Sequence, residues 1–182
     1  MVPVVKYIEP IPVDARQWPY ITYLKVRYPR TPANRVSIGS VCLIGPRVVL
    51  TAGHVVYNFR KGGWATAVSA TLGSEPRFTV RTNVVRTTRN WKDIDSRLPV
   101  PPLEAAVDYG VVVLPAAVDM AVRPLPVETA STERLRTSLL NQAGYPSTAN
   151  GTLYGARAVP VEVTKTRIAY PIATKPGQSG GP

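Results

Sequence analysis

Cysteine and histidine are the scarcest functional residues of this chain. Its 182 residues include one cysteine, Cys42, and one histidine, His54. A single cysteine excludes an internal disulfide, so the fold must be held together by its core alone. One histidine and one cysteine make no credible zinc site, so we expect no metal ion and no cofactor.

The chain also lacks long apolar runs. None approaches the roughly 20 residues of a membrane-spanning helix, so we expect no membrane partner. The N-terminus does not show the charged-then-apolar pattern of a secretory signal. A lone cysteine fits a reducing compartment, and it fits a disulfide-free secreted protein equally well, so the compartment stays open.

Acidic residues are few. The chain carries 22 Lys and Arg against 11 Asp and Glu, a net charge of +11. The basic residues are densest over residues 77–97, where Asp93 and Asp95 interrupt them. Because no aromatic-interleaved recognition motif accompanies this region, the pattern favours a solvated basic surface over a nucleic-acid site.

Proline and glycine, in contrast, are plentiful and evenly spread, with 19 and 13 residues. Between them lie short runs rich in Val, Ile, Thr and Tyr, which predict an all-β barrel or sandwich. The predicted strands are residues 21–28, 36–44, 47–51, 65–72, 77–86, 109–114, 156–163 and 166–171. Residues 129–141 are predicted as a helix capped near Ser131.

His54 and Asp108 each stand at the end of an apolar run. His54 follows a β-type run and the small-residue turn 51–53, and imidazole is suited to proton transfer near neutral pH. Asp108 precedes the run 109–114, and a carboxylate at the mouth of a buried strand needs a partner such as an imidazolium. Taken singly, His54 could be a packed structural histidine and Asp108 a cap on backbone amides.

Ser179 lies in a glycine-rich segment, Gly177-Gln-Ser-Gly-Gly-Pro182. Glycines on both sides permit a tight turn that aims successive N–H groups beside the hydroxyl, where an oxyanion would form. A surface loop is the plain alternative. The three segments together supply the nucleophile, base and orienter of acyl transfer, in the order His, Asp, Ser. This order excludes the α/β-hydrolase elbow, in which the histidine follows the serine.

These segments resemble those of the trypsin/chymotrypsin-like serine proteases. Residues 51–54 resemble their histidine box, residues 108–114 their aspartate box and residues 177–182 their serine box. Residues 144–146, Gly-Tyr-Pro, and the approach to the serine over residues 170–179 are closest to the bacterial and fungal glutamyl-endopeptidase-like branch.

The resemblance implies two antiparallel Greek-key β-barrels with the active site between them. The domain limits would be an N-terminal extension at 1–17, a first barrel at 18–115, a linker at 116–127 and part of a second barrel at 128–182. It implies a serine endopeptidase with His54, Asp108 and Ser179 as the triad. The N–H groups of Gly177 and Ser179 would form the oxyanion hole, and Thr174 would lie in the substrate pocket.

Two departures from the family pattern matter. Gln178 has no carboxylate, so it cannot form the N-terminal ion pair that activates digestive zymogens of the family. Family members also continue past the serine box with strands that complete the second barrel. We therefore expect a partial sequence with an incomplete second barrel.

Three functions remain open from the sequence. The first is a serine endopeptidase that acts on polypeptides. We expect it to be a monomer that protein inhibitors can bind, and the family resemblance slightly favours secretion. The second is an inactive protease-fold binding module or fragment. The third is a basic β-barrel that binds nucleic acid with steep salt dependence, which the pattern does not favour.

Overall fold

The computed structural model describes residues 7–72, 78–89, 91–92, 107–118, 122–148 and 150–181. Strands dominate these residues, as the sequence predicts, and the helical pieces are short: α1 at Gly53–Val56, α3 at Thr132–Thr137, and 3-10 turns at Ala15–Gln17 and Phe59–Lys61. Within the described ranges, no helix has the length and apolar character needed to cross a membrane.

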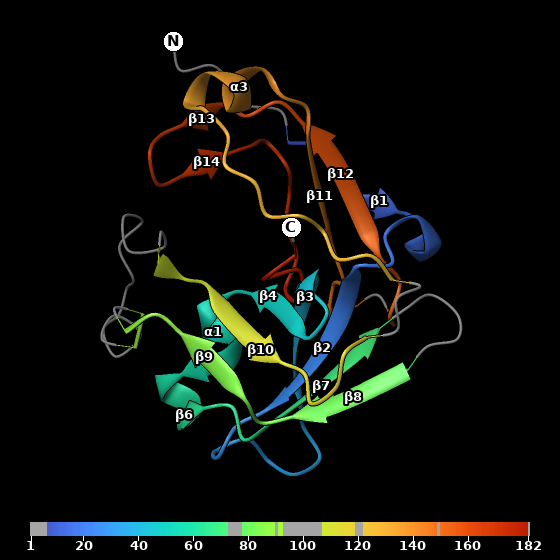
Figure 1. Cartoon of the computed structure of the whole chain (residues 1–182), viewed down its shortest axis with the longest axis vertical. Helices are drawn as coiled ribbons and strands as arrows, with labels where there is room; N and C mark the ends of the chain where they lie inside the picture. The colour runs from blue at the N-terminus through green and yellow to red at the C-terminus, as the bar shows by residue number, and fades with distance from the viewer. Residues whose placement is uncertain are drawn as a thin grey trace.

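The first group of strands forms one nearly closed, seven-stranded antiparallel sheet, in the lower half of Figure 1. Its order is β8 (Phe78–Thr82), β7 (Ala67–Leu72), β2 (Ile21–Arg27), β3 (Ser37–Gly45), β4 (Val48–Thr51), β10 (Gly110–Val113) and β9 (Val85–Thr87). A two-stranded hairpin, β5 (Tyr57–Asn58) and β6 (Gly63–Trp64), accompanies it.

Alternation along the strands builds the core of this barrel. On β2, Leu24 and Val26 are fully buried while Lys25 between them is exposed. Leu43 and Val112 join the same apolar cluster from β3 and β10. Burying such side chains contributes roughly 1.5–3 kcal/mol each, which is how the barrel is stabilised without a disulfide.

The second group of strands is smaller and open. A three-stranded sheet runs in the order β1 (Ile11–Pro12), β12 (Tyr154–Ala158) and β11 (Leu140–Gly144), beside the hairpin of β13 (Glu162–Val163) and β14 (Ile168–Ala169). Three strands cannot close a barrel, so the second barrel is incomplete.

The N-terminal segment belongs structurally with this second group. Ile11 pairs with Gly155 on β12. The Ile8 N–H donates to the Pro171 carbonyl at 2.7 Å, and the Ala173 N–H donates back to the Ile8 carbonyl at 3.0 Å. The domain limits stay predictions, and residues 1–6 and 119–121 lie outside the described residues.

Three of the predicted elements differ from the structure. The predicted strand 156–163 is divided between β12 and β13, which lie in separate sheets. The predicted helix 129–141 is real only over Thr132–Thr137, with the Ser131 side chain accepting from the Arg134 N–H at 3.2 Å. Its last two residues, Leu140 and Asn141, begin β11, whose five residues pair with β12, so tertiary pairing overrides the local helix signal there. The predicted strand 77–86 is two strands, β8 and β9, on opposite edges of the sheet.

Candidate active site

Strand register brings His54 and Asp108 together. β10 pairs antiparallel with β4, and Gly110 lies opposite Thr51. The chain leaving β4 therefore passes the chain entering β10. His54 follows Thr51 by three residues, on α1, and Asp108 precedes Gly110 by two. His54 and Asp108, which are 54 residues apart in sequence, meet because the end of β4 lies beside the start of β10.

Asp108 holds His54 through both carboxylate oxygens. Oδ1 accepts from the His54 backbone N–H at 2.8 Å, and Oδ2 lies 2.7 Å from His54 Nδ1. The Asp108 side chain is 19% exposed and that of His54 39%, so the pair is partly shielded while the imidazole remains accessible. A carboxylate on Nδ1 favours the tautomer whose Nε2 can accept a proton.

Neighbouring residues fix this pair. The hydroxyls of Thr87 and Thr88 donate to the carbonyls of Tyr109 and Val107 at 2.8 and 2.9 Å, on either side of Asp108. A Cβ on Gly53 would lie 2.7 Å from Thr87 Oγ1 and 3.0 Å from Asp108 Oδ1, so this approach requires glycine.

Trp91 lies beside the imidazole. Its ring is 4% exposed and lies 6.2 Å from the His54 ring, centroid to centroid. Its indole N–H donates to the Tyr57 carbonyl at 3.4 Å. Our sequence reasoning missed Trp91, because nothing in its local pattern connects it to His54.

Ser179 is placed against the first barrel by its backbone. The Ser40 N–H on β3 donates to the Ser179 carbonyl at 2.8 Å. The Ser40 hydroxyl donates to the Gly177 carbonyl at 2.9 Å and accepts from the Tyr145 N–H at 2.7 Å. Ser40 is fully buried, and through these three bonds it connects the first barrel to the serine loop and to Tyr145. Sequence reasoning missed Ser40 as well, because a serine within a strand carries no functional signal.

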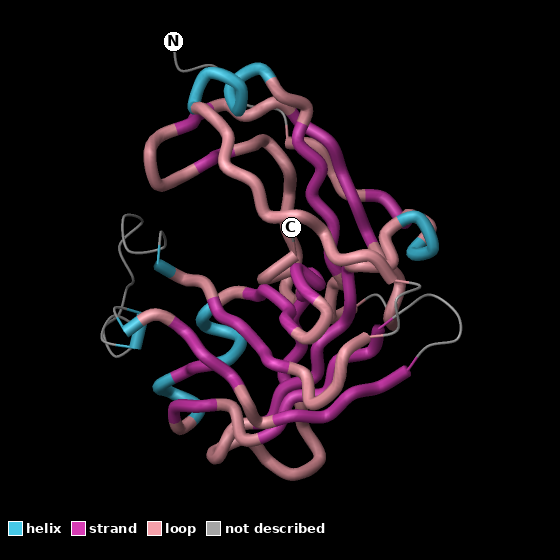
Figure 2. The backbone as a smooth tube through the Cα atoms, viewed as in Figure 1, coloured by secondary structure: helices cyan, strands magenta, loops and turns pink. Residues whose placement is uncertain are grey.

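Gly180 sets the serine loop directly against the histidine turn. A Cβ at Gly180 would lie 2.2 Å from Thr51 Oγ1 and 2.7 Å from the Ala52 nitrogen. Its φ of +83° is also one that other residues rarely adopt. Only glycine permits this contact, which holds Ser179 close to the turn that carries His54. In Figures 1 and 2, the C-terminal loop lies between the two groups of strands.

The backbone around Ser179 presents candidate oxyanion donors. Among the described residues, the N–H groups of Gly177 and Ser179 donate to no protein acceptor. Gln178, which lies between these two residues, closes the turn that begins at Lys175. Its backbone N–H donates to the Lys175 carbonyl at 3.1 Å, and its side-chain Oε1 accepts from the Lys175 N–H at 2.7 Å. Gln178 is buried, and its Nε2 has no partner in the described part of the chain.

Thr174 lies just before this loop and is exposed. The adjacent Ala173 N–H bonds to the Ile8 carbonyl, so the N-terminal segment runs alongside the predicted pocket residue. Its role in substrate binding stays a prediction.

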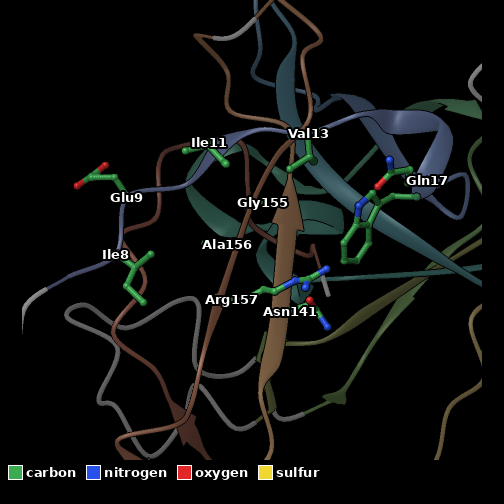
Figure 3. Close-up of a pocket in the computed structure, with 10 residues that line it drawn as sticks. Ile8, Glu9, Ile11, Val13, Gln17, Asn141, Gly155, Ala156 and Arg157 are labelled. Atoms are coloured by element: carbon green, nitrogen blue, oxygen red, sulfur yellow. The ribbon is translucent and has the colours of Figure 1, made fainter.

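A separate cavity of about 420 Å³ lies between the N-terminal segment and the β11–β12 sheet. Its walls include Ile8, Ile11 and Val13, with Glu9 and Arg157 as its charged groups (Figure 3). None of the described residues that line it is a serine, cysteine or histidine, so these residues offer no nucleophile or base of the kind proposed for acyl transfer. No cluster of three His, Cys, Asp or Glu that could hold a metal lies among the described residues.

Comparison with known proteins identifies the family. The Trypsin family model matches residues 9–182, so the chain belongs to the Trypsin family of serine proteases. A Glu endopeptidase solved with MPD is 17% identical, with a TM-score of 0.72 over 98% of this chain and 80% of that one. No curated protein sequence matches the chain.

Two further structures illustrate the range of the fold. The protease Anisep from Arthrobacter nicotinovorans is 16% identical, with a TM-score of 0.67 over 94% of this chain and 77% of that one. A scabies mite inactivated protease paralogue, S-D1, is 13% identical, with a TM-score of 0.66 over 95% and 79%. At these identities the likeness shows the chymotrypsin-type fold, and that fold is shared with a protein named as inactivated.

Proposed function

We propose that this protein is a serine endopeptidase that hydrolyses polypeptides through an acyl-enzyme on Ser179. The observation that carries the proposal is the pairing of His54 with Asp108 beside the serine loop. Asp108 accepts from His54 at 2.8 Å and lies 2.7 Å from its ring. Gly180 contacts the turn that precedes His54.

In the proposed acylation, Ser179 Oγ forms a bond to the scissile carbonyl carbon and gives its proton to His54 Nε2. The oxyanion of the tetrahedral intermediate accepts from the N–H groups of Gly177 and Ser179. The carbon–nitrogen bond then breaks, and His54 gives the proton to the leaving amine. Water, deprotonated by His54, hydrolyses the ester and restores the serine.

Asp108 orients His54 in each of these steps and stabilises the imidazolium through the contact with Nδ1. Thr174 is proposed to contact the substrate side chain. It is neutral, and a preference for Lys or Arg requires a buried acid, so a trypsin-like specificity is not expected. We expect a monomer that protein inhibitors can block.

Fluorophosphonate labelling tests the proposal directly. We expect one label per chain, mapped to Ser179, and no label on Ser179→Ala or His54→Ala. Ser138→Ala, which removes a half-buried hydroxyl that donates to the Arg134 carbonyl at the end of α3, is the matched control and should label normally. Cleavage of a mixed peptide library should disappear in the same two variants. An unlabelled but fully folded protein would overturn the proposal and favour an inactive binding module.

A further inference from the structure

The outer face of the first barrel carries a basic groove over β2, β7 and β8, which lie side by side (Figure 1). On β2, Leu24 and Val26 point into the core, so the alternate residues Lys25 and Arg27 point outward and are exposed. None of the residues assigned to acyl transfer lies on this face.

Register places cations and hydroxyls in rows across the three strands. Lys25 is opposite Ser69, and Ser69 is opposite Arg81, so one row has a cation at each end and a hydroxyl between them. In the next row Thr71 is opposite Thr79, and their hydroxyls are 3.4 Å apart. With strands about 4.8 Å apart, the backbones at Lys25 and Arg81 are roughly 10 Å apart.

These groups surround a groove of about 630 Å³. Among the described residues, its lining contains no acidic side chain, and Val36 and Ala67 add apolar surface. The ion pairs of the described residues, Arg16–Asp14, His54–Asp108 and Arg167–Glu162, do not involve Lys25, Arg27 or Arg81. The groove therefore concentrates positive charge that no described carboxylate neutralises.

We propose that this groove docks an extended acidic segment of a polypeptide partner. In an extended chain, side chains on one side repeat at about 7 Å, which is also the spacing of Lys25 and Arg27 along β2. Carboxylates at alternate positions can thus meet successive cations. Ser69 and Thr71 can donate to the same carboxylates, and the apolar lining suits the aliphatic parts of a peptide.

The groove fits a nucleic acid or a sulfated polysaccharide less well. None of the described residues that line it is aromatic, and the Tyr23 ring next to it on β2 already has Lys25 Nζ 5.7 Å from its centroid, so bases have no free ring to stack on. A polysaccharide offers no apolar side chain for the exposed Val36. The assignment extends beyond catalysis, because docking here needs neither His54 nor Ser179.

Direct binding tests the proposal without relying on catalysis. The probe is a fluorescein-labelled (Glu-Ser)5 peptide, and the protein is the intact chain carrying Ser179→Ala, so that the probe is not cleaved. The test variant is Lys25→Glu with Arg81→Glu. The matched control is Arg134→Glu with Arg136→Glu, two exposed arginines on α3 that change the net charge equally. Thermal unfolding verifies that each variant is folded.

We expect the groove variant to weaken binding of the probe about tenfold or more, and the control to change it less than about twofold. Equal weakening in both variants would overturn the proposal, because general charge attraction would then suffice. So would undetectable binding to the unaltered groove. Tighter groove-dependent binding of a heparin octasaccharide or a DNA oligonucleotide would overturn the polypeptide assignment.

A second measurement keeps the two proposals distinct. The groove variant is also made with Ser179 retained, and its labelling by fluorophosphonate is measured. If the groove variant loses the peptide but labels normally, docking is lost while catalysis is intact. If the parent protein binds the peptide yet never labels, the catalytic proposal fails and docking stands.

Discussion

The two units of the chain hold their parts of the candidate site in different ways. His54 and Asp108 are held by a strand ladder inside the first barrel, around a large cluster of buried apolar residues. The serine loop belongs to the smaller unit, where the buried Ala143, Tyr145 and Leu153 cluster with Ile21 from β2 of the first barrel. That loop is fixed by hydrogen bonds to Ser40 and by the contact of Gly180 with Thr51.

The two parts are therefore sensitive to different substitutions. His54 and Asp108, the proposed base and its orienter, depend on strand register, which a point substitution rarely shifts. Ser179, the proposed nucleophile, depends on a few contacts across the junction, so removing one of them should displace it while leaving His54 in place. The following substitutions separate the two cases.

Asp108→Asn should have the largest effect, a loss of about 10⁴-fold in kcat. The amide can still occupy the site, but its NH₂ group faces Nδ1 and selects the wrong tautomer of His54. The measurement is kcat and KM on a cleaved peptide, with Asp14→Asn, an exposed carboxylate bonded to Arg16, as the control. A variant with near-normal kcat would remove Asp108 from the proposed triad.

Ser40→Ala should have the next largest effect. It leaves the Gly177 carbonyl and the Tyr145 N–H without their buried partner, which costs about 1–3 kcal/mol of unfolding free energy. We expect kcat to fall about 10- to 100-fold, because the loop bearing Ser179 shifts, with a smaller change in KM. Urea unfolding and steady-state kinetics measure both effects, and Ser138→Ala serves as the control. A loss of stability with unchanged kcat would show that Ser40 does not position the loop.

Gln178→Met should act more weakly, lowering kcat up to about tenfold. It removes the acceptor for the Lys175 N–H and also the buried Nε2 that has no described partner. These two changes oppose each other in stability, so the unfolding temperature should hardly move. A large drop in the unfolding temperature would show that Nε2 has a partner after all.

Cys42 should matter least to the site and only at high pH. Burial raises the pKa of its thiol from 9.0 to about 11. The unfolded chain therefore loses the thiol proton first. The stability that the buried, protonated Cys42 thiol contributes is fully present below pH 9. Between pH 9 and 11 this contribution is lost, which lowers the free energy of unfolding by up to roughly 3 kcal/mol. Chemical unfolding across this range should show the decline, and Cys42→Ala should make it smaller, most clearly below pH 10, because burial also raises the pKa values of Tyr20, Tyr23 and Tyr170 from 10.0.

The strands were the most predictable part of the fold. Alternating apolar residues over β2 and β7 and the run preceding His54 are local signals, and the structure confirms strands there. The predicted helix was too long. Residues 132–137 carry a local helix signal, whereas residues 140–144 carry no local strand signal and are a strand because they pair with β12. The pairing of Ile11 with β12 has no local signal either.

The candidate site also contains residues that local sequence signals indicate and residues that they do not. His54, Asp108 and Ser179 stand in short segments of distinctive composition, so the sequence alone makes each of them a candidate, and their roles stay predictions. Trp91 and Ser40 were missed, because their importance comes from residues that are far away in the chain. Trp91 reaches His54, and Ser40 reaches Tyr145, Gly177 and Ser179.

The all-β class, the lack of an internal disulfide and the chemical groups available for reaction could be read from the amino-acid sequence. Each of these depends on residue type or on alternation over a few neighbours. Three features needed the folded chain: the β4–β10 register that joins Asp108 to His54, the bonds by which Ser40 anchors the serine loop, and the row of Lys25, Ser69 and Arg81. Contacts between distant segments depend on which strands pair, and pairing is settled by the whole core rather than by any one segment.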